Sequence, residues 1–394
     1  MLGRAAGQIR ASPSVAPAPI IIVLIIMVTV VTTTVSYAAL SPASTPTSGP
    51  ASSPASCQRQ SCEEIVLTDR ESGAIAGGTQ VSIDVDWSSY GPVVASNLQN
   101  VQFLDSAGAP VPAWLESCNG SESSCSSSSN SSLVWVKLDQ SIQLGGQIRI
   151  FLAFASTSTN DLSPTGDWGE SPQLSPTYAE FDNGARVFNF YDDFAGTSLG
   201  SQWNTGAGSN PVTVKDGLTV GPAQSENDAD AISTVSSFGE GAIDFYGVIP
   251  VNAAHSGVFT YAGVGVGTAK STAPGCCYFD NSVLIGESTG TYGLETGSSD
   301  GLDEGPGSIV AGLTFGTNST YSILIPSSSP STVTASVNYG QNISSSTGLP
   351  TLPQPIAIFN QKNTGIPIGP VYWIRERTYT EPGAVTQLIS TVSG

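Results

Sequence analysis

The stretch VFNFYDDFAGTSLGSQW, residues 187–203, sets two adjacent acids inside a run of aromatic residues. Paired carboxylates beside aromatic rings are compatible with a sugar-cleaving site, a metal site or the edge of a strand. Consecutive residues of a strand point to opposite faces, so Asp192 and Asp193 cannot both reach one bond. The stretch is therefore better interpreted as a strand that runs into a loop than as a catalytic pair.

Short strand-like segments lie on both sides of this stretch. Upstream, apolar residues occupy every second position in QVSIDVDW (80–87), NVQFLD (100–105), LVWVKLD (133–139) and QIRIFLAF (147–154). Downstream, short segments rich in β-branched and aromatic residues follow at regular spacing, separated by glycine-rich turns. The predicted fold class is all-β, with two tandem antiparallel β-sandwiches at residues 57–180 and 186–380.

The composition is acidic but poor in charge. Lysine and arginine total 12 against 31 aspartate and glutamate residues, for a net charge of −19, yet only 11% of residues are charged. Nucleic acid is not an expected partner, because phosphate binding needs a dense cationic face. Because carboxylates lose their charge below about pH 4, we expect a protein that tolerates an acidic medium.

The N-terminal region is apolar and follows basic residues. Residues 20–40 are largely apolar, and small residues before Ala39 fit cleavage of a secretory signal. A retained membrane anchor fits equally, since about 20 apolar residues span a bilayer. The segment RASPSVAPAPIIIVLIIMVTVV also resembles the N-terminal helix of archaeal type IV pilin-like proteins. Pro17 and Pro19 depart from that pattern, because proline breaks a helix.

Linker-like segments flank the two units. Residues 41–56 are dominated by serine, threonine and proline, so we expect a disordered stalk after a signal peptide or anchor at residues 1–40. Residues 381–394 are expected to form a C-terminal tail. This order predicts an extracellular, cell-surface protein, which is membrane-anchored if residues 20–40 are retained.

Cysteines and glycosylation sequons favour the same location. The six cysteines fall in three close pairs: Cys57/Cys62, Cys118/Cys125 and Cys276/Cys277. Such spacings predict small disulfide loops in an oxidising compartment, with the connectivity of the adjacent third pair left open. Four sequons lie in turn-like settings and are expected to be exposed: Asn119, Asn130, Asn318 and Asn342.

The first unit carries four short patterns in order: Phe103-Leu104-Asp105, a turn at Gly108, Trp114-Leu115-Glu116 and Val134-Trp135-Val136. In these patterns, residues 64–156 resemble a domain family of unknown function found in archaeal and bacterial surface proteins. The final strand departs from the family by ending in AFAS. The resemblance implies a surface module without a defined reaction. Glu116 beside Trp114 is interpreted as structural, with Trp114 in the sandwich core and Glu116 at a strand end.

The second unit begins with the quoted stretch and ends with VYWIRERTYTEP, residues 371–382. These two segments resemble the opening and closing strands of a concanavalin-like lectin/glucanase jelly roll, in which the first and last strands run near one another. The resemblance implies that at least one of two arginines lies near one of two acids and ties the domain's ends together. The residues of this structural pairing are Asp192, Asp193, Arg375 and Arg377.

Catalysis is not expected from the sequence. Some jelly-roll glycosidases use alternating carboxylates within one strand, and the nearest pattern here, Glu226, Asp228 and Asp230, stands in a polar segment. The single histidine, His255, lies in a turn-like segment, so a Ser-His-Asp set would depend on it alone. The chain is accordingly predicted not to be an enzyme.

Calcium is the one cofactor that the sequence suggests. Concanavalin-like modules often bind calcium in loops, and Asp300, Asp303 and Glu304 lie together among glycines. Calcium requires six to eight oxygen ligands, several of them from carboxylates and backbone. A solvated acidic loop is the alternative interpretation.

The sequence therefore predicts a non-catalytic cell-surface protein for adhesion or glycan recognition, or a structural component of the envelope. Expected partners are cell-surface glycans or other envelope proteins, and the membrane if the N-terminal helix is retained. Two alternatives stay open: a self-assembling subunit of a pilus-like extracellular filament, and a glycoside-acting enzyme. Candidate sugar-binding aromatics are Tyr246, Tyr261, Tyr292 and Trp373.

Overall fold

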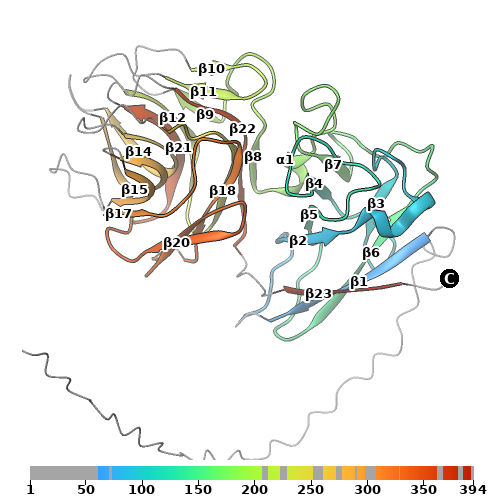
Figure 1. Ribbon diagram of the computed structural model, residues 1–394. Coiled ribbons are helices and arrows are strands. Elements are labelled where there is room, and N and C mark those ends of the chain that lie inside the picture. Colours follow the sequence, from blue (N-terminus) through green and yellow to red (C-terminus); the bar gives the residue numbers. More distant parts are fainter. Residues whose placement is uncertain are drawn as a thin grey trace, which may run out of the picture. The chain divides into compact units, whose positions relative to one another are not determined.

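The structure is a computed structural model (Figure 1). It describes residues 61–394 except 71–72, 206–211, 222–228, 252–260, 272–276, 289–290, 298–307, 328, 362–366, 380–384 and 392–394. The predicted signal, anchor and stalk lie outside the described residues, as do Cys57, Glu226, Asp228, His255, Cys276, Asp300, Asp303 and Glu304. Within the described part, no helix combines the length and apolarity that crossing a membrane requires.

The fold is all-β, as predicted, and the first sandwich contains two four-stranded sheets. One sheet has the strand order β23-β1-β6-β3 and the other β2-β5-β4-β7. The strands are β1 Ser61–Asp69, β2 Gln80–Val85, β3 Val101–Leu104, β4 Ala113–Cys118, β5 Ser132–Lys137, β6 Gln147–Phe154, β7 Trp168–Glu170 and β23 Val385–Thr391. Neighbouring strands are antiparallel except β4 and β7, which run parallel.

Alternating side chains build the core of the first sandwich. In β2, Val81, Ile83 and Val85 are buried, whereas Ser82 and Asp84 are exposed. Burying one such aliphatic side chain contributes about 1.5–3 kcal/mol, so a pattern repeated over several strands fixes which face turns inward. In β2, Ser82 and Asp84 are left for the outer face of the sheet.

The C-terminal residues do not form the expected tail. β23 pairs with β1 over seven residue pairs, from Glu63 opposite Thr391 to Asp69 opposite Val385. Figure 1 shows β23 running beside β1. The chain therefore returns to the first sandwich after completing the second. The short segment VTQLIST does not by itself predict this pairing, because its partner strand lies more than 300 residues earlier in the chain.

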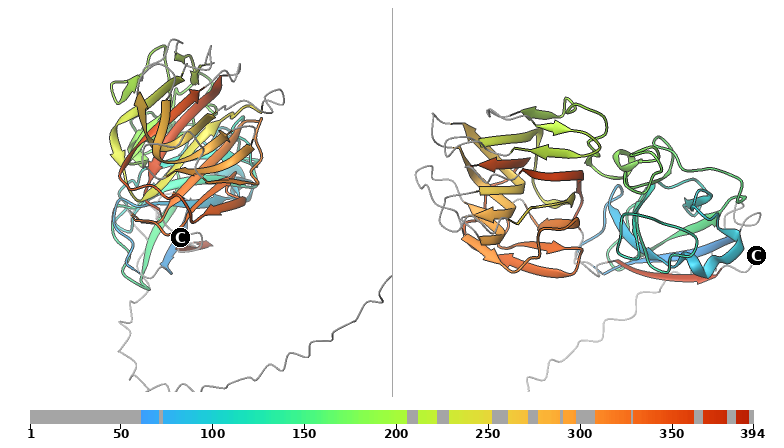
Figure 2. Two further views of the ribbon diagram at one scale, coloured as in Figure 1. Left: turned by 90° about the vertical axis from the view of Figure 1, so that its left-hand side faces the viewer. Right: turned by 45° about the horizontal axis from the view of Figure 1, so that its top comes forward.

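The second sandwich is a jelly roll whose two sheets appear as stacked layers in Figure 2. One sheet has the order β10-β11-β22-β13-β18-β19-β20, with β8 added to β22, and the other β17-β16-β15-β14-β21-β12-β9. The strands are β8 Phe190–Asp192, β9 Trp203–Thr205, β10 Thr213–Val214, β11 Leu218–Val220, β12 Ala229–Phe238, β13 Gly241–Gly247, β14 Tyr261–Ser271, β15 Cys277–Ser288, β16 Thr291–Gly297, β17 Ser308–Ala311, β18 Ser319–Ile325, β19 Val333–Val337, β20 Gln341–Ser345, β21 Gln354–Gln361 and β22 Ile368–Arg377.

Two short helices complete the described elements: the 3-10 helix η1, Trp87–Val93, and α1, Gly184–Val187. The helix α1 stands just before β8, in the segment that leads from the first sandwich into the second.

The two ends of the jelly roll are neighbouring strands. β8 pairs with β22 and places Asp192 opposite Ile374 and Tyr191 opposite Arg375. Residues directly opposite in a sheet share a face. Ile374 belongs to the jelly-roll core, so Arg375 lies on the outer face of the same strand. That outer face contacts the first sandwich, and we call this contact region the junction.

Candidate functional site

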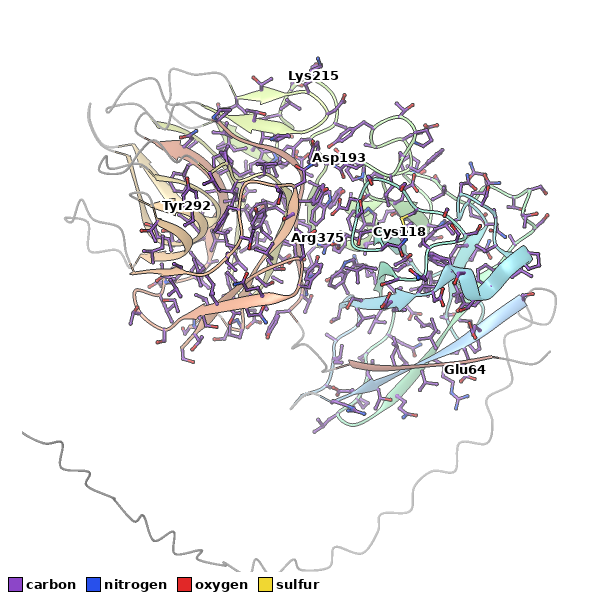
Figure 3. All side chains as sticks on the ribbon, viewed as in Figure 1. Glu64, Cys118, Asp193, Lys215, Tyr292 and Arg375 are labelled. Carbon is purple, nitrogen blue, oxygen red and sulfur yellow. A yellow bond between two sulfur atoms is a disulfide. The ribbon has the colours of Figure 1, made fainter. Side chains whose placement is uncertain are left out.

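Arg375 is fully buried at the junction (Figure 3). Its guanidinium carbon lies 4.4–5.2 Å from the centroids of four aromatic rings, those of Trp114, Trp135, Phe188 and Trp373. Guanidinium is weakly hydrated and is attracted to the faces of aromatic rings, which makes arginine the cation best suited to such a setting. The first sandwich contributes Trp114 from β4 and Trp135 from β5, so one charge holds rings from both sandwiches.

Two carboxylates balance the charge of Arg375. Its Nε donates to Asp244 Oδ2 at 2.9 Å and its Nη2 donates to Glu116 Oε2 at 2.8 Å. Arg377 donates to the same Asp244 oxygen at 2.7 Å, and Ser322 adds a further hydrogen bond. Burial alone would raise the pKa of Asp244, but the guanidinium groups of Arg377 and Arg375 outweigh it and hold that pKa below its ordinary value.

The arginines were expected near Asp192 or Asp193 on neighbouring strands. The strands β8 and β22 are neighbours, but in the described part of the chain Arg375 and Arg377 form ion pairs with Glu116 and Asp244. Asp192 instead accepts hydrogen bonds from Trp203 Nε1 at 2.5 Å, Gln202 Nε2 at 2.7 Å and the backbone of Phe194 at 2.8 Å. Asp193 accepts one from the backbone of Ala195. The reason is register: Asp192 shares the core-facing side of the sheet with Ile374, whereas Arg375 points to the opposite side.

Glu116 is a member of the junction and does not stand at a strand end as expected. It lies inside β4 and is 1% exposed. Trp135 Nε1 donates to its Oε2 at 2.6 Å, and the hydroxyl of Tyr339 lies 3.0 Å from both of its oxygens. Trp114 likewise packs at the junction, at right angles to Trp373, and belongs to that aromatic cluster instead of the sandwich core.

A second buried acid, Glu122, reaches the junction from a disulfide-closed loop. Cys118 and Cys125 are bonded, as the sequence predicted, and the loop between them turns through left-handed backbone at Asn119 and Gly120. Trp373 Nε1 donates to Glu122 Oε2 at 2.9 Å. Burial raises the pKa of Glu122 well above its ordinary value, and the negative charge of Glu116 raises it further.

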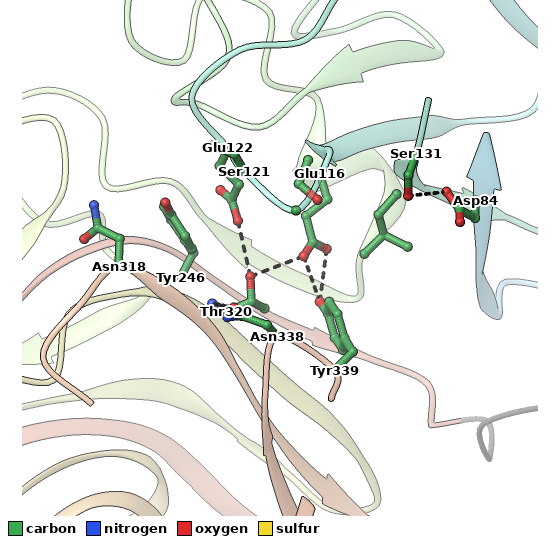
Figure 4. Close-up of a pocket in the computed structure, with 13 residues that line it drawn as sticks. Asp84, Glu116, Ser121, Glu122, Ser131, Tyr246, Asn318, Thr320, Asn338 and Tyr339 are labelled. Carbon is green, nitrogen blue, oxygen red and sulfur yellow. Dashed lines mark hydrogen bonds between the residues drawn. The ribbon is translucent and has the colours of Figure 1, made fainter. Parts of the chain in front are cut away.

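A cavity of about 360 Å³ adjoins the two glutamates (Figure 4). Its walls come from both sandwiches and combine acids, aromatic phenols, amides and hydroxyls. The acids, phenols and amides that line it include Glu116, Glu122, Tyr246, Asn318, Asn338 and Tyr339. The ring of Tyr246 is stacked on Trp373, which fixes its orientation at the cavity wall.

The remaining predicted residues have the following places. All four sequon asparagines are exposed, and Asn318 lines the cavity. Cys62 is disulfide-bonded. Among the candidate aromatics, Tyr246 lines the cavity, Trp373 is fully buried, and Tyr292 packs against Phe315. The described residues include no group of three or more histidine, cysteine, aspartate or glutamate side chains arranged to hold a metal ion.

Sequence reasoning missed Glu122, Thr320 and Tyr339. Glu122 lies in the serine-rich insertion NGSESSCSSSSNSS, which is typical of a solvated turn. The available signal was that Glu122 is the only charged residue of that insertion and lies between two cysteines that form a disulfide. Thr320 and Tyr339 carry no signal of their own, because their role arises only when the two sandwiches meet.

The geometry defines a class of protein: a tandem all-β chain whose second sandwich is a jelly roll. Among solved structures, Bacillus licheniformis β-glucanase is 17% identical with a TM-score of 0.33, over 48% of this chain and 98% of that one. The Crh5 transglycosylase in complex with NAG is 16% identical with a TM-score of 0.34, over 48% and 84%. The carbohydrate recognition domain of Emp47p is 10% identical with a TM-score of 0.33, over 48% and 94%. These likenesses concern the fold alone.

Sequence comparison adds a viral relative. No family model matches the chain. The uncharacterized protein 562 of Sulfolobus islandicus rod-shaped virus 1 is 32% identical over 129 residues, which are 32% of this chain and 20% of that protein. The chain therefore spans about a fifth of the length of this curated relative.

The expectation that the chain is not an enzyme is corrected by the structural neighbours. They include glucanases and a transglycosylase beside a carbohydrate recognition domain, so the fold gives no ground for a non-catalytic assignment. Two carboxylates alternating on one strand were expected of an enzyme. At the junction, however, Glu116 comes from a strand and Glu122 from a loop.

Proposed function

We propose that the protein binds carbohydrate outside the cell and that the cavity at the junction is its glycan site. The observation that carries this proposal is the chemistry of the cavity wall. Tyr246 presents an aromatic surface, Asn318 and Asn338 offer amides that both donate and accept, and Glu116 and Glu122 offer acceptors. Aromatic surface with a few convergent polar groups suits a ligand that is apolar on its ring faces and polar at its rim.

The size and location of the cavity support the same proposal. Its volume of about 360 Å³ falls within the range typical of small-ligand sites. An extracellular location is supported by the Cys118–Cys125 disulfide and by the exposure of all four sequon asparagines. The filament alternative depends on the N-terminal apolar segment, which lies outside the described residues.

Substitutions at the cavity wall test this proposal. A glycan array with the full-length protein identifies an oligosaccharide, and calorimetry then measures its affinity for variants. Asn318→Ala and Tyr246→Phe should each weaken binding by about tenfold, the effect of one lost hydrogen bond of ~1 kcal/mol or slightly more.

Asn342→Ala is the matched control for Asn318→Ala. Both asparagines are exposed and both belong to sequons, but only Asn318 lines the cavity. Binding that survives Asn318→Ala and Tyr246→Phe unchanged would place the glycan elsewhere. An array with no bound glycan would count against the proposed function itself.

A further inference from the structure

One hydroxyl group stands between the two buried glutamates. Thr320 Oγ1, from β18 of the jelly roll, lies 3.4 Å from Glu116 Oε1 and 3.3 Å from Glu122 Oε1 (Figure 4). The two carboxyl groups belong to the first sandwich, so this hydroxyl joins one sandwich to the other. All three side chains are buried: Glu116 is 1%, Glu122 3% and Thr320 6% exposed.

The count of protons decides how these contacts are made. A threonine hydroxyl carries one hydrogen and can make a full-strength hydrogen bond to only one acceptor, whereas an ionised carboxylate can only accept. Two ionised glutamates would therefore leave one of the two contacts without a hydrogen, between lone pairs in a buried setting. Both contacts become hydrogen bonds if one glutamate is protonated, donates to Thr320 and so frees the threonine hydrogen for the other.

The surrounding groups determine which glutamate holds the proton. Glu116 is paired directly with Arg375 at 2.8 Å and receives further hydrogen bonds from Trp135 and Tyr339, so it is already supplied with donors. Glu122 has no arginine within hydrogen-bonding distance among its described contacts. It accepts a hydrogen bond from Trp373 Nε1 and a longer one, of 3.4 Å, from the Ser171 hydroxyl.

The groups around Glu122 act on its pKa in both directions, and those that raise it are the stronger. On β4 it faces the negative Glu116, and burial together with that charge raises its pKa. On β22 Arg375 lowers this pKa to a lesser extent, since its charge is already shared between Glu116 and Asp244. Tyr246 on β13 and Asp84 on β2 line the same cavity. Glu122 is thus the group that carries the proton.

We propose that Glu122, Thr320 and Glu116 form a proton-dependent clasp between the two sandwiches. With one proton on Glu122, hydrogen bonds run from Glu122 to Thr320 and from Thr320 to Glu116, and the junction is closed. Loss of that proton sets two carboxylates against one hydroxyl and loosens the contact between β18 and the disulfide-closed loop. Because both glutamates line the cavity, the clasp also controls the wall of the proposed glycan site. The clasp itself does not depend on what that site binds.

Calorimetric unfolding of the full-length protein between pH 4 and pH 9 tests the clasp. At pH 4 the two sandwiches should unfold in one transition. At pH 9 the transition should split or broaden, with the less stable sandwich unfolding on the order of 5 °C earlier. Glu122→Gln keeps a donor beside Thr320 at every pH, so this variant should retain a single transition at pH 9.

Two further variants separate the clasp from general pH effects. Thr320→Val removes the bridging hydroxyl and should give the split pattern at pH 4 as well. Glu170→Gln replaces another buried acid, whose pKa is raised to about 7 by burial, but one that contacts Ser175 and not the clasp. This variant should still give two transitions at pH 9, although the transition of the first sandwich shifts in temperature because residue 170 no longer titrates. The proposal fails if Glu122→Gln splits at pH 9 as the wild type does, or if Thr320→Val unfolds in one transition throughout.

Discussion

Replacing Arg375 by methionine should lower the free energy of unfolding by about 3–5 kcal/mol, the usual cost of removing one partner from a buried ion pair. The substitution leaves the buried carboxylates of Asp244 and Glu116 with Arg377 as the remaining cation. Arg377 bonds directly to Asp244. Methionine fills a similar volume among the four rings, so the loss reports charge more than packing. Urea unfolding at pH 7 measures the change.

Two comparisons make this result specific. Arg375→Lys keeps the charge but loses the planar fork that reaches Asp244 and Glu116 together, so an intermediate loss is expected. Arg149→Met breaks a partly exposed pair with Glu64 and should cost no more than about 1 kcal/mol. If Arg375→Met cost as little as Arg149→Met, the junction would not be the ionic centre that the geometry indicates.

Acidification from pH 8 to pH 5 should stabilise the protein by several kcal/mol. Burial raises the pKa of Glu170, Asp182 and Glu376 to about 7 in each case. Between their ordinary values near 4 and that raised value, the folded chain holds protons that the unfolded chain has released. Each group therefore adds stability that is complete below about pH 4 and is lost as pH rises through about 7. One pKa unit corresponds to about 1.4 kcal/mol, so each group accounts for at most ~3–4 kcal/mol.

Asp182→Asn tests one part of this effect. Trp114 Nε1 donates to Asp182 Oδ1 and the Tyr191 hydroxyl donates to Oδ2. An asparagine with its oxygen in the Oδ1 position still accepts from Trp114, and its amide can donate to the Tyr191 oxygen. The variant should fold, and its unfolding free energy should change less steeply between pH 5 and pH 8 than that of the wild type. Equal slopes in urea titrations of the two proteins would show that Asp182 does not hold a proton in this range. Asp244 acts in the opposite direction, because its lowered pKa gives stability that is lost only at strongly acid pH.

Several features of the fold were predictable because they depend on local pattern. Alternation in segments such as QVSIDVDW predicted strands with a buried face. The resemblance of the opening and closing stretches to jelly-roll strands predicted that β8 lies beside β22. The partners of Arg375 were not predictable in the same way. A shift of one residue in register changes the face on which a side chain lies, and the sequence does not state the register.

The candidate site could not be predicted from the sequence for a related reason. Glu116 was predicted to stand at a strand end. It lies inside β4, and its side chain is buried because the second sandwich covers the outer face of its sheet. Thr320 and Tyr339 are about 200 residues farther along the chain and meet Glu116 only through tertiary packing. The return of β23 to β1 depends on the same kind of long-range contact.

Hydrogen exchange of the full-length protein, with and without an oligosaccharide selected on the array, tests the central claim most directly. If the cavity at the junction is the glycan site, bound oligosaccharide should slow exchange in residues 116–122, 318–320 and 338–339, which belong to both sandwiches. Protection confined to the strands β14, β15 and β21 of the other jelly-roll sheet, with the junction unchanged, would contradict the account.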